Sequence, residues 1–215
     1  MKLLVFDIDD TLTKTAELHQ RFFVECLKKL GSKKDSYDFG SYIHHTDSYI
    51  FREIYTSEID SDYSFQCLID FESMMINKFN KERIIEIRGA KSFLNNVEVN
   101  NDYCYCFATG SLKKPAQFKL DSLGLSEYNS VLACSNDIES REDIVTDAIE
   151  KSKMEYSQDE FDDIILFGDG IWDLKTAKNL NINFFGIGEK NKRLLLDSGC
   201  EWHSDDFAGV TLEGL

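Results

Sequence analysis

Short apolar segments alternate with segments of helical periodicity along most of the chain. Residues 2–6 are apolar after Lys2 and are expected to form a buried strand. Residues 16–30 repeat apolar side chains about every four positions and end at Gly31, which predicts an amphipathic helix. Further short apolar segments predict four more strands and a possible short one near the C-terminus, at residues 103–108, 130–134, 163–167, 183–187 and 201–203.

The order of these elements predicts the fold class. From residue 102 onward a helix follows each strand, which is typical of βαβ units in a parallel sheet. We therefore expect an α/β fold, a Rossmann-like doubly wound parallel sheet, formed by a core domain of residues 1–13 and 89–215. Residues 14–88 show helical patterns only and are expected to form an inserted α-helical cap domain. The helices are expected at residues 16–30, 47–57, 62–80, 90–97, 111–123, 141–152, 172–180 and 189–198.

Polar residues directly follow the predicted strands, where ligands of open α/β sheets bind. The first strand leads into the sequence DIDDT, which contains Asp7 and Asp9. Continued strand geometry would direct these two carboxylates to one side, because Ile8 separates them. Two close carboxylates repel each other unless a cation is present, and Mg²⁺ prefers such oxygen ligands. The predicted magnesium site also includes Asp169 and Asp173, which follow the fourth strand.

A phosphate site is predicted beside these carboxylates. Thr109 and Gly110 join a strand to a helix start, where backbone N–H groups and a hydroxyl favour an anion. Ser140 and Asp143 are expected to form a capping box, so Arg141 is expected at the first position of a helix, where a cation opposes the helix dipole by roughly 0.3–1 kcal/mol. A bound phosphate would justify that cost. Lys113 and Lys114 are alternatives for the cationic role.

Composition narrows the classes of partner. The formal net charge is −15, which disfavours binding to nucleic acid or to an anionic membrane surface. No apolar window is long enough for a transmembrane helix, and no signal peptide is recognised. The six cysteines are scattered and are expected to be reduced, so a cytoplasmic location is expected.

Four motifs in this order resemble the haloacid dehalogenase-like superfamily, in its magnesium-dependent phosphatase branch with a helical cap, as in phosphoglycolate phosphatases. The motifs are FDIDDTLT, FATGS, Arg141 and GDGIWD. The resemblance implies that Asp7 is the nucleophile and a magnesium ligand. It implies that Asp9 is the general acid/base and offers its backbone carbonyl to the metal. Two positions depart from the family pattern, because Asp10 stands where glycine is common and Arg141 where lysine is more common.

The expected activity is hydrolysis of a small phosphorylated metabolite through an aspartyl phosphate at Asp7. His45 and Arg52 are candidate substrate contacts in the cap. A phosphomutase of the same fold, similar to β-phosphoglucomutase, is the first alternative, and a non-catalytic binding protein is the second. The sequence leaves open a monomer or a homodimer.

Overall fold

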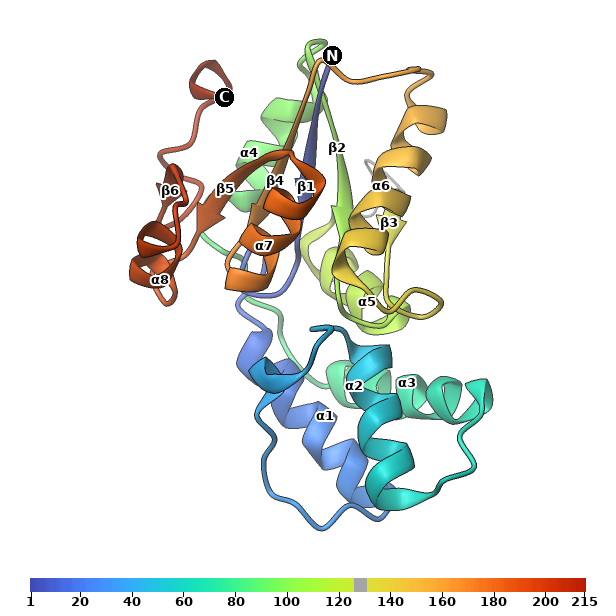
Figure 1. Ribbon diagram of the computed structural model, residues 1–215. Helices are drawn as coiled ribbons and strands as arrows, with labels where there is room; N and C mark the ends of the chain where they lie inside the picture. Colours follow the sequence, from blue (N-terminus) through green and yellow to red (C-terminus); the bar gives the residue numbers. More distant parts are fainter. Residues whose placement is uncertain (126–130) are drawn as a thin grey trace.

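A parallel sheet lies at the centre of the structure, a computed structural model that describes residues 1–125 and 131–215. In the described part its six strands have the order β3-β2-β1-β4-β5-β6 (Figure 1). The central strand β1 pairs with both β2 and β4, and Phe6 lies opposite Phe107 and Phe167. The carboxyl ends of these three strands are therefore adjacent. The strands are β1 (Lys2–Phe6), β2 (Tyr103–Ala108), β3 (Leu132–Ala133), β4 (Asp163–Gly168), β5 (Asn183–Ile187) and β6 (Trp202–Ser204).

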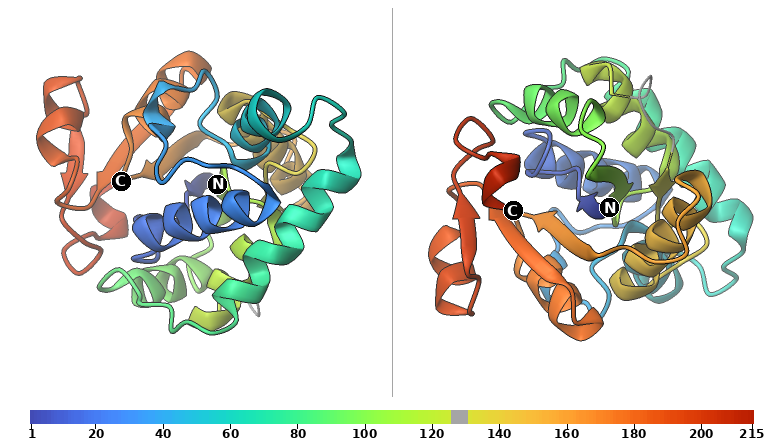
Figure 2. Two further views of the ribbon diagram at one scale, coloured as in Figure 1. Left: turned by 90° about the horizontal axis from the view of Figure 1, so that it is seen from below. Right: turned by 90° about the horizontal axis from the view of Figure 1, so that it is seen from above.

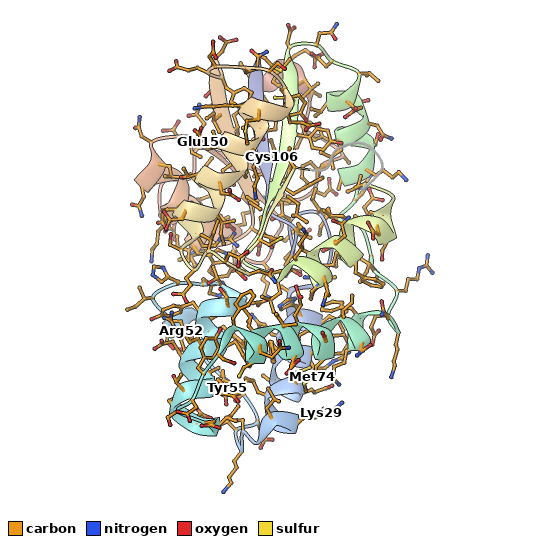
Figure 3. The ribbon with its side chains drawn as sticks, turned by 90° about the vertical axis from the view of Figure 1, so that its right-hand side faces the viewer. Lys29, Arg52, Tyr55, Met74, Cys106 and Glu150 are labelled. Atoms are coloured by element: carbon orange, nitrogen blue, oxygen red, sulfur yellow. The ribbon has the colours of Figure 1, made fainter. Side chains whose placement is uncertain are left out.

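Helices cover both faces of the sheet. Successive side chains of β1 point to opposite faces, and because they are apolar on both, each face must be covered. On one face Leu4 and Phe6 belong to the apolar core shared with α4 (Ala90–Glu98) and α5 (Lys113–Leu123). On the other face Leu3 and Val5 belong to the core shared with α6 (Arg141–Glu155), α7 (Ile171–Leu180) and α8 (Lys192–Asp197). Cys106 lies on this second face, between β2 and α6 (Figure 3). The predicted doubly wound α/β fold is thus confirmed.

A separate layer of helices lies beyond the carboxyl ends of the strands (Figure 1, and from below in Figure 2). It contains α1 (Ala16–Leu30), α2 (Asp47–Ile54) and α3 (Phe65–Phe79). The two connections between this layer and the sheet lie side by side, because Lys14 N donates to Ile85 O and Ile87 N donates to Leu12 O. This arrangement agrees with a cap inserted into a core, although the division at residues 13/14 and 88/89 stays a prediction.

Several element bounds differ from those predicted. The third strand is described only for two residues, while Ser130 of the predicted strand lies outside the described residues. The helix expected over 47–57 ends at Ile54 and continues as a π-helical turn, Tyr55–Ile59. The helix expected over 62–80 begins only at Phe65, because Ser64 has extended backbone. Shorter helices than expected also occupy residues 113–123 and 192–197.

Two predicted helix ends are confirmed in detail. Gly31 ends α1 with φ 117°, a left-handed conformation that glycine adopts without strain. Ser140 caps α6, because its side chain accepts a hydrogen bond from Asp143 N at 3.0 Å. Arg141 is therefore the first residue of α6, as predicted. Within the described residues, no helix combines the length and apolar character needed to cross a membrane.

Candidate active site

A cavity of about 260 Å³ lies between the strand ends and the helical layer. Seven of the nine predicted site residues line this cavity. Six of them line the cavity from the sheet side or from the loop before α2: Asp7, Asp9, Thr109, Gly110, Arg141 and His45. Asp169 also lines it. Asp173 lies just behind and is fully buried, whereas Arg52 does not line this cavity.

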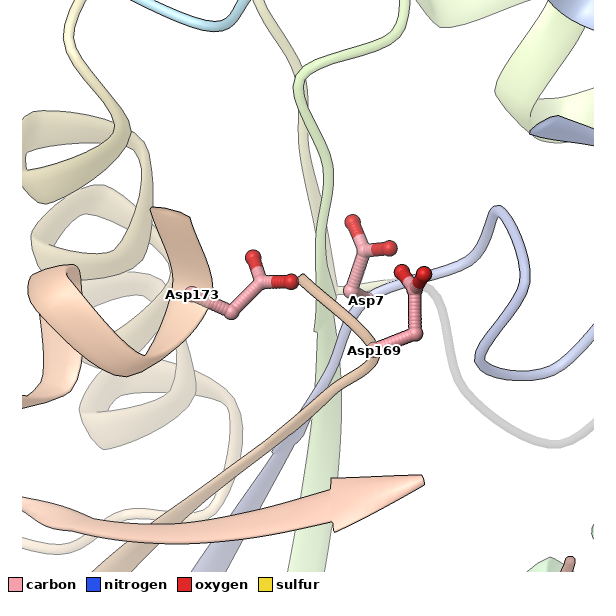
Figure 4. Close-up of side chains that lie close together, drawn as sticks. All are labelled: Asp7, Asp169 and Asp173. Atoms are coloured by element: carbon pink, nitrogen blue, oxygen red, sulfur yellow. The ribbon is translucent and has the colours of Figure 1, made fainter. Parts of the chain in front are cut away.

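Three buried carboxylates form a candidate metal centre. Asp7, Asp169 and Asp173 each offer an oxygen, and these oxygens lie within 4.8 Å of one another (Figure 4). Asp7 continues from β1, Asp169 follows β4, and Asp173 lies in the first turn of α7. Oxygen ligands from a few carboxylates, with space for water and phosphate beside them, suit Mg²⁺. The Asp9 carboxylate is not part of this cluster and contacts other residues instead.

The electrostatics of this cluster also favour a bound cation. Burial raises the pKa of Asp7 to about 8, with Asp173 and Asp9 adding to the effect and Arg141 opposing it. Burial and the neighbouring Asp173 raise the pKa of Asp169 well above its usual range. A divalent cation would stabilise both carboxylates in their charged forms. The residues present therefore fit a magnesium site.

Arg141 lies against the carboxylate cluster. Its Nη2 atom donates to Asp7 Oδ1 at 3.1 Å and also contacts Asp173 Oδ1. The guanidinium is buried, so this ion pair is shielded from solvent. Lys113 and Lys114 are exposed and do not line the cavity, and Lys114 pairs with Glu72 instead. Of these three predicted alternatives, Arg141 is the cation placed at the cavity.

The loop after β2 approaches the cavity closely. A Cβ atom on Gly110 would lie 2.7 Å from His45 O and 2.8 Å from Arg141 Nη1, so only glycine fits there. Thr109 N donates to Ala133 O, and Ser111 N donates to Thr109 Oγ1. These two N–H groups are therefore occupied, whereas the N–H of Gly110 has no hydrogen-bond partner among the described residues. The predicted phosphate site at Thr109 and Gly110 stays a prediction.

Asp9 is held by three side-chain donors. Thr15 Oγ1 donates to Asp9 Oδ1 at 2.6 Å, and Ser111 Oγ and Lys119 Nζ donate to Asp9 Oδ2 at 2.7 and 2.6 Å. Burial acts to raise the pKa of Asp9, but Lys119 and the other polar neighbours outweigh it and lower the pKa. Asp9 is thus a fixed carboxylate at the cavity wall.

Lys119 also belongs to this site, although it was not predicted from the sequence. It lies on α5, where its apolar neighbours on the same helix face are Ala116, Leu120 and Leu123. A lysine on the apolar face of a predicted helix is a signal that could have identified it, because lysine is almost never fully buried without a partner.

The two cap candidates have different positions. The His45 ring stacks on Trp172 with centroids 3.9 Å apart, and this pair closes one side of the cavity. Burial, followed by the nearby Arg141, lowers the pKa of His45 to about 4, so its imidazole is neutral at physiological pH. Arg52 on α2, labelled in Figure 3, forms an ion pair with Glu139 of the core instead. Their predicted roles as substrate contacts stay predictions.

Comparisons with known proteins place these features in a family. A family model described as haloacid dehalogenase-like hydrolase matches residues 4–187. CbbY from Rhodobacter sphaeroides, solved in complex with phosphate, has a TM-score of 0.71 and 18% identity, over 99% of this chain and 98% of that one. The same protein has been solved as a mutant with xylulose-1,5-bisphosphate.

Two further solved structures share the fold. A family IA, variant 3 haloacid dehalogenase-like hydrolase from Entamoeba histolytica has a TM-score of 0.73 and 20% identity, over 99% of this chain and 96% of that one. A hydrolase from Pseudomonas syringae has a TM-score of 0.66 and 18% identity, over 96% and 94%. No curated protein sequence matches this chain. The family match spans most of the chain, and the chain belongs to the haloacid dehalogenase-like hydrolases.

Proposed function

We propose that the protein is a Mg²⁺-dependent phosphatase of a small phosphorylated metabolite, acting through an aspartyl phosphate at Asp7. One observation carries this proposal. The Asp7 carboxylate belongs to a cluster that fits a divalent cation, and it also accepts a hydrogen bond from the buried guanidinium of Arg141. A nucleophile, a metal site and a phosphate-binding cation therefore meet at one side chain.

The residues of the cavity have distinct tasks in this mechanism. Asp7, Asp169 and Asp173 would hold Mg²⁺, which when bound shields the nucleophile from the phosphate charge and stabilises charge in the transition state. An Asp7 carboxylate oxygen attacks phosphorus, and the bond from phosphorus to the substrate oxygen breaks. Arg141 and Thr109 bind the phosphoryl oxygens. The negative charge of a bound phosphate opposes the effect of Lys119 on the pKa of Asp9, and Asp9 in its protonated form gives a proton to the leaving oxygen.

The second half of the reaction regenerates Asp7. Asp9, now a carboxylate, takes a proton from a water molecule, and the resulting hydroxide attacks the phosphorus of the aspartyl phosphate. The acyl phosphate bond breaks, and inorganic phosphate leaves. Helices of the cap limit the access of other water molecules to the site, since they form one wall of the cavity.

The cavity wall on the cap side suits an uncharged organic group. Its side chains are mainly apolar or uncharged, with Phe39, Ile50 and Gln20 among them, and its carboxylate is that of Asp47. Among the described residues that line the cavity, the cationic side chains are Arg141 and Lys190, and Lys190 is exposed and close to Asp10 and Glu17. A second phosphate on the cap side would therefore lack a cation.

This arrangement favours a phosphatase over a phosphomutase, because a mutase of this kind must hold a bisphosphate during transfer. We expect a sugar or polyol monophosphate to be hydrolysed with a kcat/KM at least about 10-fold above that of the corresponding bisphosphate, which corresponds to about 1.4 kcal/mol. Initial rates with matched pairs of such esters test this expectation. Faster turnover of bisphosphates, or phosphoryl transfer to a sugar without phosphate release, would instead favour the mutase.

The direct test of the proposed function is phosphate release from an aryl phosphate, with Mg²⁺ and with EDTA. We expect release with Mg²⁺ and loss of that release with EDTA, restored when excess Mg²⁺ is added. Release that is unaffected by EDTA would contradict the metal assignment. No release from aryl or metabolite phosphates, together with no Mg²⁺ binding by calorimetry, would favour a binding protein.

Two properties of the cysteines support a cytoplasmic location for this activity. All six are free, which a reducing compartment favours. Burial raises the pKa of Cys104, Cys106 and Cys134 to about 12, so these thiols are poorly reactive and can stay reduced.

A further inference from the structure

We infer that Lys119 is a positioning residue for Asp9. The inference rests on the proposed function, in which Asp9 protonates the leaving oxygen. Lys119 has an exposed fraction of 0%, although lysine is seldom buried in this way. It does not line the cavity and therefore does not touch the substrate. Its effect on catalysis must pass through the residues that it holds.

The ammonium group of Lys119 has a matched set of acceptors. Its Nζ atom lies 2.6 Å from Asp9 Oδ2, 3.2 Å from Ser111 Oγ and 3.0 Å from His19 Nδ1. An ammonium has three protons to donate, and these three acceptors use them all. The Phe79 ring lies 5.0 Å from Nζ and adds a cation–π contact. The lysine is thus fixed in one position inside the protein.

This arrangement restricts Asp9 to one orientation. Lys119 and Ser111 both donate to Asp9 Oδ2, while Thr15 donates to the other oxygen. The two oxygens are held from different elements, because Thr15 precedes α1 and Lys119 lies on α5. A general acid is effective only within hydrogen-bond reach of the oxygen that it protonates, so its orientation affects the rate directly.

The same lysine links Asp9 to the helical cap. Lysine is only a donor, so His19 Nδ1 accepts from Lys119, and His19 Nε2 carries the proton that it donates to Asp47 Oδ1 at 2.9 Å. Asp47 is the first residue of α2, and its other oxygen accepts from Leu112 N at 2.9 Å. A continuous buried chain of polar contacts therefore runs from Asp9 to the docked end of α2.

Two phosphate esters with different leaving groups distinguish the positioning of Asp9 by Lys119 from a purely structural role of Lys119. Nitrophenolate is a weak base and leaves without a proton, whereas an alkoxide needs the proton of Asp9. For Lys119→Met, which keeps the length of the side chain, we expect kcat/KM for an alkyl phosphate, which covers the steps up to release of the leaving group, to fall at least about 10-fold. We expect kcat/KM for nitrophenyl phosphate to change less than about 3-fold, since the departure of nitrophenolate does not depend on the acid.

A double variant tests whether Lys119 acts through Asp9. In an Asp9→Asn protein, the further change Lys119→Met should have little additional effect on alkyl phosphate, because coupled residues are not additive. Ser111→Ala removes a smaller donor to the same oxygen and should give the same dependence on leaving group. Ser111→Ala therefore tests the same inference if Lys119→Met does not fold. The exposed Lys151→Met is the matched control and should leave both rates unchanged.

The outcomes separate the inference from the proposed function. The positioning role would be overturned if Lys119→Met and Ser111→Ala each lost the same activity toward both esters. It would also be overturned if the losses of Lys119→Met and Asp9→Asn were fully additive. In either case hydrolysis by the native protein would still support the proposed function. Failure of the native protein to hydrolyse either ester would overturn the proposed function, and the inference with it.

Discussion

Replacing Asp7 with asparagine is expected to lower the rate of phosphate release at least about 1,000-fold, the order of loss that follows removal of a nucleophile. Asparagine has nearly the same shape as aspartate, but its amide does not form an acyl phosphate by attack on phosphorus. The variant also loses one carboxylate of the candidate metal centre. Initial rates with saturating Mg²⁺ and an aryl phosphate measure the effect.

The control for this variant is Asp197→Asn on the exposed end of α8, where the carboxylate only approaches Arg193. Its activity should equal that of the native protein. Thermal unfolding of both variants without Mg²⁺ shows whether they are folded. A folded Asp7→Asn protein that retains more than about a tenth of native activity would exclude Asp7 as the nucleophile.

The second large expected effect is the stabilisation of the folded protein by Mg²⁺. We expect Mg²⁺ to raise the unfolding temperature, because it binds the three carboxylates of the folded protein and has no such site in the unfolded chain. At a Mg²⁺ concentration about 100 times Kd the gain is about 2.7 kcal/mol. In a chain of this length that gain corresponds to roughly 5–10 °C. Differential scanning calorimetry without substrate measures it.

The size of this stabilisation should depend on pH. Burial raises the pKa of Asp7 from 3.8 to about 8 and also raises that of Asp169. Between these values the folded, metal-free protein binds more protons than the unfolded chain, so its stability falls as pH rises. Binding of Mg²⁺ requires the deprotonated carboxylates. The increase in unfolding temperature should therefore be small near pH 5 and largest near pH 8.

Asp169→Asn is the variant that tests this account. Without Mg²⁺ it should be at least as stable as the native protein at pH 8, because it removes a buried carboxylate that has no cation. It should also respond weakly to Mg²⁺. An equal response to Mg²⁺ in the native protein and in Asp169→Asn would place the metal elsewhere.

The sequence predicted the strand-end residues of the site because the fold imposes their proximity. Parallel pairing of β1 with β2 and β4 brings Asp7, Thr109 and Asp169 to one edge, whatever the rest of the chain does. The position of Arg141 followed from the capping sequence at Ser140, which is a local signal. Local periodicity and topology were sufficient for these residues.

The contacts that depend on packing between layers were not predictable in this way. Lys119 lies 110 positions from Asp9 in the sequence, and its burial depends on how α5 packs against α3 of the helical layer. The ion pair between Arg52 and Glu139, 87 positions apart, also depends on how the cap docks. Such contacts involve side-chain positions of distant elements, which periodicity alone does not specify.

Trapping of the phosphorylated enzyme is the strictest test of Asp7 as the nucleophile. The native protein and Asp9→Asn are mixed with Mg²⁺ and nitrophenyl phosphate and stopped in acid within the first turnover, and the peptides are analysed by mass spectrometry. We expect one phosphoryl group on Asp7, with more of it in Asp9→Asn because hydrolysis of the intermediate is slower. Phosphate release in the first turnover without a phosphoryl group on Asp7 in either protein would contradict this expectation.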